Sequence, residues 1–192
     1  MVIPDRALRS GDGLLVVDVQ VDFCPGGALP IPEGDQVIPI LNAWIEAAQE
    51  RGIPVYFSRD WHPARHVSFR DQGGEWPPHC LQDSPGARFH PDLRVPEGAV
   101  LITKGVRLDK DQNSAFDETG LAEQLRRDQV RHLWVGGLAL DVCVRATVLD
   151  ALRLEGPSVA VIRNATRPVD PEAGERTERE MREGGARVEE SA

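Results

Sequence analysis

Short apolar runs alternate with longer segments of helical periodicity along the 192-residue chain. Residues 14–17 form a continuous apolar run, as in strands that are covered on both faces. Between residues 34 and 51, apolar residues recur every three or four positions, which predicts a helix that ends at Gly52. By the same criteria we expect strands at residues 53–57, 100–103, 132–135, 159–162 and 187–188, and helices at residues 141–154 and 171–183.

This alternation predicts an α/β fold in a single domain that spans residues 1–192. We expect a mostly parallel sheet of about six strands with helices on both faces, as in Rossmann-like proteins. In such sheets the ligand site lies beyond the carboxyl ends of the strands. Residues 59–97 show no clear periodicity and are too many for an ordinary connection, so we expect a functional loop there.

The charge balance narrows the possible partners. A formal net charge of −9 argues against nucleic acid and anionic membranes, since both are bound mainly through Lys and Arg. No apolar run reaches the length of a membrane span, and the N-terminus lacks a signal-peptide core, so we expect a cytoplasmic protein. The three cysteines form no C-x-x-C pair, which favours free thiols in a reducing compartment.

The expected loop at residues 59–97 concentrates candidate metal ligands. Within 20 residues it places Asp60 together with three of the chain's five histidines, His62, His66 and His79. Carboxylates and imidazoles bind divalent transition metals such as zinc, iron(II) and manganese, so we expect one such ion here. The spacing is also compatible with surface histidines that fall close together by chance.

Polar and nucleophilic residues follow the carboxyl ends of the expected strands. One edge of the sheet would therefore hold four of them: Asp18, Asp60, Lys104 and Cys143. Taken singly, Asp18 is compatible with a turn cap, Lys104 with a solvated loop residue and Cys143 with a small core residue. Their coincidence at one edge favours a catalytic site.

Cys143 has the strongest chemical case. It follows a Gly-Gly turn and falls in the first turn of a predicted helix, where unpaired N–H groups and the helix dipole favour a thiolate. The same N–H groups would stabilise an oxyanion once the thiolate attacks a carbonyl carbon. With Asp18 as the base and Lys104 as the neighbouring ammonium, the three residues form a workable set for acyl transfer.

Seven short motifs indicate a known enzyme family. They are D-V-Q-V-D-F-C-P-G-G-A-L at 18–29, D-W-H-P at 60–63, W-P-P-H-C at 76–80, F-H-P-D-L at 89–93, T-K-G at 103–105, S-A-F at 114–116 and G-L-A-L-D-V-C-V at 137–144. Through them nearly the whole chain resembles the nicotinamidase branch of the isochorismatase-like cysteine hydrolases. Each motif is weak alone, whereas seven in the family's order are highly specific.

The resemblance implies a catalytic role for each strand-end residue. Cys143 matches the nucleophile, Asp18 the general base that later acts as an acid, and Lys104 the third member of the triad. The backbone N–H groups of Ala139 and Cys143 match the oxyanion hole. The family also has a cis peptide bond that matches Leu138-Ala139.

The resemblance also implies a metal centre and a ring-binding pocket. The matching metal ligands are Asp60, His62, His66 and His79. His66 falls where the family varies the position of its middle ligand. Zinc is the first choice of ion, with iron or manganese as alternatives. Phe23 and Trp76 match the aromatic residues that enclose a pyridine ring, whereas Asn113 stands where relatives often have an aromatic residue.

The implied activity is the hydrolysis of nicotinamide to nicotinate and ammonia through a cysteine thioester, a step of NAD salvage, with pyrazinamide as an analogue substrate. The alternative is a related metal-dependent amidase of the same superfamily that acts on another small amide. The partner would then be a small-molecule amide, with neither nucleic acid nor membrane, and a homo-oligomer is expected because family members commonly self-associate.

Three other functions remain to be distinguished. In a metallohydrolase, metal-bound hydroxide would attack and Cys143 would be incidental. An isochorismatase or N-carbamoyl amidase of the same fold would lack the full histidine set. A non-catalytic metal-binding or redox module would explain the loop histidines but would not need Asp18 and Lys104.

Overall fold

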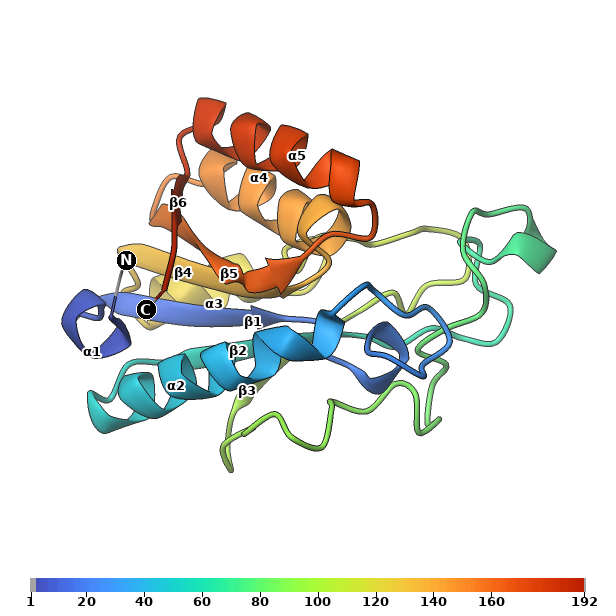
Figure 1. Cartoon of the computed structure of the whole chain (residues 1–192), viewed down its shortest axis with the longest axis horizontal. Helices are drawn as coiled ribbons and strands as arrows, with labels where there is room; N and C mark the ends of the chain where they lie inside the picture. Colours follow the sequence, from blue (N-terminus) through green and yellow to red (C-terminus); the bar gives the residue numbers. More distant parts are fainter. Residues whose placement is uncertain (1–2, 192) are drawn as a thin grey trace.

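A parallel sheet lies at the centre of the computed structural model, which describes residues 3–191 (Figure 1). Its six strands within the described residues are β1 (Asp12–Val17), β2 (Val55–Asp60), β3 (Val100–Lys104), β4 (His132–Leu138), β5 (Ser158–Arg167) and β6 (Arg187–Glu189). All neighbouring pairs are parallel, and the strand order is β3-β2-β1-β4-β5-β6. The predicted fold class is therefore confirmed.

The strand order creates a switch point between β1 and β4. From β1 the chain builds outward through β2 to β3 at one edge, and it then returns to the other side of β1 to form β4, β5 and β6. In sheets of this kind, the crevice beyond the carboxyl ends of the two central strands is where ligands bind. The fold therefore places a candidate site next to the residues that follow β1 and β4.

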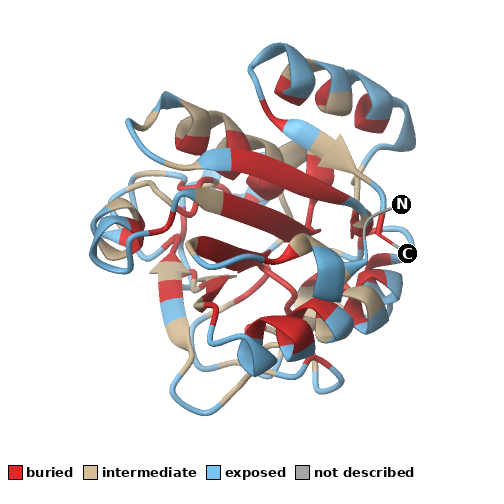
Figure 2. Cartoon of the chain, turned by 90° about the vertical axis from the view of Figure 1, so that its left-hand side faces the viewer, coloured by how far each residue is buried: buried red, intermediate tan, exposed pale blue. Residues whose placement is uncertain are grey.

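Helices cover both faces of the sheet (Figures 1 and 2). Helix α2 (Val37–Glu50), with α1 (Pro4–Ala7) beside it, covers one face, and α3 (Leu121–Arg127), α4 (Arg145–Arg153) and α5 (Pro171–Glu183) cover the other.

Because successive strand residues point to opposite faces, β1 contributes to two separate cores. Leu14 and Val16 belong to the core that contains Trp44 of α2, whereas Leu15 and Val17 belong to the core beneath α3, α4 and α5.

Several boundaries differ from the sequence-based prediction. The helix expected at 34–51 starts with a 3-10 turn at Gly34–Gln36, and the strand expected at 159–162 extends to Arg167, past an irregularity in its register with β4. Helices α1 and α3 were not predicted. Only two of the seven residues of α3 are buried, which is too few to produce a recognisable apolar period.

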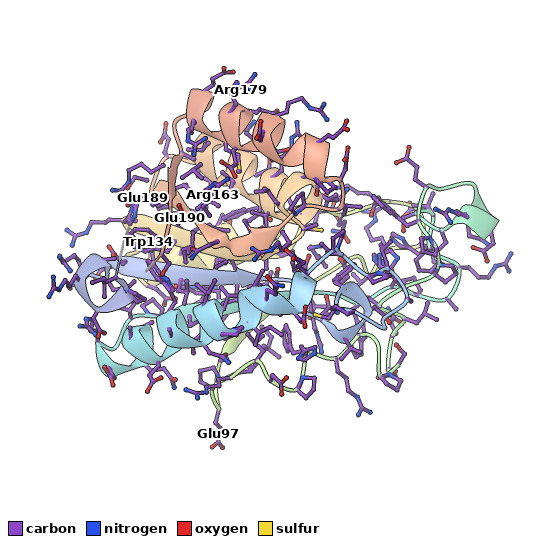
Figure 3. All side chains as sticks on the ribbon, in the orientation of Figure 1. Glu97, Trp134, Arg163, Arg179, Glu189 and Glu190 are labelled. Atoms are coloured by element: carbon purple, nitrogen blue, oxygen red, sulfur yellow. The ribbon has the colours of Figure 1, made fainter. Side chains whose placement is uncertain are left out.

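The connection between β2 and β3, residues 61–99, begins beyond the carboxyl end of the sheet, and its last part runs back along the sheet to the start of β3 (Figure 1). Within it, the only helical segment is the 3-10 turn Arg70–Gln72. Isolated bridges join His62 to Leu81 and Phe69 to Trp76. The side chain of Glu97 points away from the protein where this connection turns back toward β3 (Figure 3).

At the opposite edge, β6 is held by side chains as well as by its ladder with β5. Arg163 of β5 lies 3.0 Å from the Glu178 carboxylate of α5 and 3.8 Å from that of Glu190, which follows β6. The labelled side chains of Arg163 and Glu190 lie close together in Figure 3. Among residues 3–191, no helix is both long enough and apolar enough to cross a membrane.

Candidate active site and metal centre

Asp18 is the first residue after β1, and it is fully buried. Its φ of 47° lies in the left-handed region, which most residues avoid. The Asp18 N–H donates to the Ser58 carbonyl at 3.1 Å, and the Ser58 hydroxyl donates to Asp18 Oδ1 at 2.6 Å. Burial raises the pKa of Asp18, and the nearby Lys104 charge opposes this rise. A carboxyl group with a raised pKa suits a residue that must accept and then return a proton.

Lys104, the last residue of β3, contacts both the candidate catalytic residues and the candidate metal ligand Asp60. The parallel register sets Lys104 beside Asp60 of β2. Its Nζ lies 2.8 Å from Asp18 Oδ2, 2.6 Å from Asp60 Oδ1 and 3.4 Å from Cys143 Sγ. Burial alone would lower the pKa of Lys104, but the charges of Asp18 and Asp60 raise it well above its usual value. Lys104 is therefore a permanent ammonium ion between two buried carboxylates.

Cys143 lies beyond the carboxyl end of β4 and is 5 % exposed. Burial raises the pKa of its thiol well above the usual value, and the Lys104 charge only partly opposes this effect. A thiol with a raised pKa needs a base to take its proton. Asp18 is the buried carboxyl group beside it, with a ligand atom within 4.8 Å of Sγ.

The turn that carries Cys143 is a π-helical segment, Leu140–Val144, in place of the predicted regular helix start. Such segments are rare and occur frequently at functional sites. Asp141 anchors this turn, because its carboxylate accepts from the backbone N–H groups of Val169 at 2.8 Å and Asp170 at 3.0 Å. The local apolar pattern is the same for both helix types, so the sequence could not separate them.

Ala139 and Cys143 both line the cavity described below. Ala139 directly precedes the π-helical segment Leu140–Val144, and Cys143 lies within it. The peptide bond between Leu138 and Ala139 is cis, as the resemblance implies. The arrangement is suited to an oxyanion hole, a role that stays a prediction for these two residues.

Asp60, His62 and His79 form a compact group of possible metal ligands. Each of these buried residues offers one ligand atom, and these atoms lie within 4.8 Å of one another. His62 Nδ1 lies 3.0 Å from the Gly105 carbonyl, and His79 Nδ1 lies 2.7 Å from the Pro77 carbonyl. Because a carbonyl only accepts, both Nδ1 atoms carry protons and both Nε2 lone pairs are available. The donor set therefore fits a divalent transition metal.

The charge on Asp60 is favoured by its surroundings. Burial alone would raise its pKa, but the Lys104 ammonium holds that pKa well below the usual range. His62 Nε2 lies 3.6 Å from Asp60 Oδ2. One ionised carboxylate with two imidazoles is a common ligand combination for zinc and iron.

His66, the fourth predicted ligand, lies outside this group of three. Its ring centroid is 4.2 Å from that of His62, but its nitrogens have other partners. Nδ1 lies 2.7 Å from Ser68 Oγ, and Nε2 lies 3.1 Å from the Lys110 carbonyl. The structure thus brings together three of the four predicted ligands and places His66 behind them.

Two further residues of the D-V-Q-V-D motif fix the loop that carries the ligands. The Gln20 side chain accepts from the Asp60 N–H at 2.8 Å and donates to the carbonyls of Asp60 at 2.7 Å and Ala87 at 2.8 Å. Asp22 Oδ2 accepts from the Cys80 N–H at 2.7 Å, next to His79. The motif therefore supplies a base at Asp18 and two anchors for the metal-binding loop.

Cys143 and the three candidate metal ligands line one cavity at the switch point, whereas the fully buried Asp18 and Lys104 do not line it. Its lining residues are Phe23, Leu29, Ile31, Asp60, His62, Ser68, Trp76, His79, Asp111, Asn113, Ala139, Val142, Cys143 and Val169. The ring centroids of Phe23 and His79 are 5.5 Å apart. Asn113 Oδ1 lies 4.0 Å from Cys143 Sγ, so the position that departs from the family pattern is close to the nucleophile.

Four polar residues near the site were not identified from the sequence: Gln20, Ser58, Ser68 and Asp111. Gln20 lies inside a quoted motif, but nothing in its pattern marks a side chain that binds backbone groups. Ser58 is the fourth residue of β2 and contacts Asp18 only because β2 is beside β1. Serine is common in loops, so the sequence alone did not indicate that Ser68 lines the cavity.

Gly105 is required beside His62. Its φ is 67°, and a Cβ built on it would lie 2.4 Å from His62 Cε1. We expect Gly105→Ala to displace the His62 imidazole, to weaken zinc binding at least about 10-fold and to lower the free energy of unfolding by about 1–2 kcal/mol. Zinc competition titration and urea unfolding would measure the two effects.

Gly98→Ala is the matched control for this substitution. Gly98 has a φ of 77°, but a Cβ there meets no atom within 4 Å. The Gly98→Ala variant should therefore lose a similar free energy of unfolding, because of its positive φ, and keep the zinc affinity of the unchanged chain. Equal zinc affinity in the two variants would show that Gly105 does not position His62.

The fold and the site together are typical of one class of enzyme: a hydrolase of α/β fold with a buried cysteine, an aspartate and a lysine beside a group of possible metal ligands. The profile of the isochorismatase domain matches residues 12–192. The chain therefore belongs to the isochorismatase family, as the sequence motifs predicted.

Within this family the chain is similar to enzymes that act on amides. It is 42% identical to the nicotinamidase of Escherichia coli over 88% of this chain and 85% of that protein. The pyrazinamidase of Pyrococcus horikoshii, solved in complex with zinc, has a TM-score of 0.90 and 45% identity, covering 94% of this chain and 99% of that one.

PnC1 from L. infantum, solved in complex with nicotinate, has a TM-score of 0.86 and 35% identity over 94% of this chain and 93% of that one. These comparisons confirm that the chain is a hydrolase of this family.

Proposed function

We propose that this chain hydrolyses nicotinamide to nicotinate and ammonia, and that pyrazinamide is an analogue substrate. The observation that carries the proposal is the position of Lys104 Nζ, 2.8 Å from Asp18 and 3.4 Å from Cys143 Sγ. It joins a base and a nucleophile next to the ligand group. The E. coli relative is a nicotinamidase, and the L. infantum structure contains nicotinate, which supports this substrate.

The reaction starts at Cys143. As Sγ attacks the amide carbon, the thiol proton passes to Asp18, whose raised pKa makes it an effective acceptor in this buried site. The negative charge that forms on the amide oxygen is stabilised by the N–H groups of Ala139 and Cys143. Lys104 keeps the carboxylate of Asp18 in place throughout.

Asp18 then returns the proton. The departing nitrogen takes it and leaves as ammonia, and the acyl group remains on Cys143 as a thioester. Asp18 next removes a proton from water, which attacks the thioester carbon, and nicotinate is released as the thiol is restored. Each proton therefore moves through one buried carboxylate.

Asp60, His62 and His79 would hold the metal ion, with zinc as the first choice and iron or manganese as alternatives. When bound, the ion supplies a Lewis-acid partner for the ring nitrogen of the substrate, and so favours one orientation of the amide. Phe23 and Trp76 line the same cavity and would enclose the ring between them. A cytoplasmic location and self-association into a homo-oligomer accompany this function as predictions from the sequence.

An ammonia-release assay tests this function directly. We expect nicotinamide and pyrazinamide to be hydrolysed with kcat/KM on the order of 10²-fold above benzamide, which has the same shape but lacks the ring nitrogen. Elemental analysis of the purified protein would identify the metal. Comparable turnover of benzamide would contradict the role of the ring nitrogen. Preference for an unrelated small amide would favour the alternative amidase, for which Asn113 beside Cys143 is the structural argument.

A further inference from the structure

His66 is fully buried beside the metal-binding group, yet the proposed reaction does not use it. Its Nε2 lies 3.1 Å from the Lys110 carbonyl. A carbonyl oxygen can only accept a hydrogen bond, so Nε2 must carry a proton and donate it. This nitrogen therefore has no lone pair with which to bind a metal ion.

The other ring nitrogen of His66 is also occupied. The Ser68 backbone N–H donates to Nδ1 at 3.3 Å, and Ser68 Oγ lies 2.7 Å from the same atom. Because a backbone N–H can only donate, Nδ1 must be an acceptor, and the imidazole is neutral with its proton on Nε2. The Ser68 hydroxyl must then donate its proton to Nδ1 as well.

This hydrogen bond fixes the orientation of the Ser68 hydroxyl. With its proton directed at His66, Ser68 Oγ keeps its lone pairs for other partners. Ser68 is 6 % exposed and lines the cavity together with Asp60, His62 and His79, whereas His66 does not line it. Ser68, and not His66, therefore lines the cavity that the three candidate ligands line, as Asp111 does.

We infer that Ser68 Oγ faces the coordination sphere of the metal ion, and that His66 is a positioning residue that directs the Ser68 hydroxyl proton away from that sphere. Hydrogen-bonding partners behind a metal site commonly contribute about 10–100-fold to metal affinity. The inference rests on the metal centre of the proposed function, but not on its substrate.

A double-mutant cycle with zinc ions as the probe tests this arrangement. Apo-protein is titrated with zinc in competition with a chromophoric chelator, for the unchanged chain, Ser68→Ala, His66→Gln and the double variant. Gln keeps a side-chain donor for the Lys110 carbonyl but offers no ring acceptor to Ser68. We expect each single change to weaken zinc binding about 10-fold, and the double change to weaken it no further.

Other outcomes would overturn the inference. A loss of 10³-fold or more in His66→Gln, on the order of a lost ligand, with no loss in Ser68→Ala would make His66 a direct ligand. Additive losses would show that the two residues act separately, and unchanged affinity in every variant would remove both from the metal centre. An unchanged chain that binds no zinc would overturn the inference together with the metal centre.

Two controls separate these results from unfolding and from the proposed activity. Ser84→Ala removes a hydroxyl from the same connection, where Ser84 Oγ accepts from the Ala87 N–H at 3.3 Å, and it should keep the zinc affinity unchanged. Thermal unfolding of each variant shows whether the fold is retained. If the zinc affinities follow the expected double-mutant cycle but the protein does not hydrolyse nicotinamide, the proposed function is contradicted and the inference about Ser68 and His66 is not.

Discussion

Cys143→Ala should abolish ammonia release while the protein keeps its metal. We expect kcat to fall at least about 10⁴-fold, because Asp18 and Lys104 remain in place but have no nucleophile to activate. The substitution removes one atom from a side chain that is 5 % exposed, so the fold should persist. Steady-state ammonia release and elemental analysis of the same preparation would measure both quantities.

Cys24→Ala is the control for this variant. Cys24 is another buried free thiol, but it does not line the cavity. Its variant should keep kcat within a factor of about three, because a small substitution away from the site changes stability and not chemistry. If Cys143→Ala retained turnover within 100-fold of the unchanged chain, the covalent route would be wrong and a metallohydrolase route would be favoured.

Lys104→Met should damage both stability and activity. The substitution leaves the Asp18 and Asp60 carboxylates, both almost fully buried, without the ammonium that lies 2.8 and 2.6 Å from them. Removing one partner of a buried ion pair costs about 3–5 kcal/mol, because a charge remains in the interior without compensation. We also expect kcat/KM to fall on the order of 10³-fold, since Asp18 loses the group that orients it.

The second lysine of the chain supplies the comparison. Lys110 is partly exposed, and its Nζ lies 2.7 Å from Asp117 and 3.1 Å from Glu118. Lys110→Met should leave the free energy of unfolding nearly unchanged, because exposed ion pairs contribute little. Urea unfolding of both variants measures the difference, and equal losses would contradict the role assigned to the buried ammonium.

The sequence placed the candidate catalytic residues at one edge of the sheet because they follow strands that are easy to recognise. Asp18 directly follows an apolar run, Lys104 and Cys143 come within a few residues of one or of a Gly-Gly turn, and parallel strands end at one edge. What could not be predicted is which of them touch. The contact between Lys104 and Asp60 depends on the register of β2 with β3, and that register is set by packing across the whole sheet.

The remaining differences have similar causes. The π-helical turn at Leu140–Val144 depends on Asp141, whose partners lie 28 and 29 residues further along the chain. The position of His66 outside the group of three candidate ligands depends on Ser68 and on the Lys110 carbonyl, 44 residues away, which are the partners of its ring nitrogens. A motif gives the spacing of residues along the chain, whereas the orientation of an imidazole is decided by distant hydrogen-bonding partners.

The candidate catalytic residues and the candidate metal ligands both depend on β3, which is an edge strand. The strand has a single neighbour, β2, and the consecutive residues Lys104 and Gly105 at its end hold the carboxylates and the His62 ring. Edge strands open locally at a lower free energy than central strands. Each local opening of β3 would therefore remove Lys104 from the two carboxyl groups and Gly105 from the His62 ring together, and amide hydrogen exchange would measure the free energy of that opening.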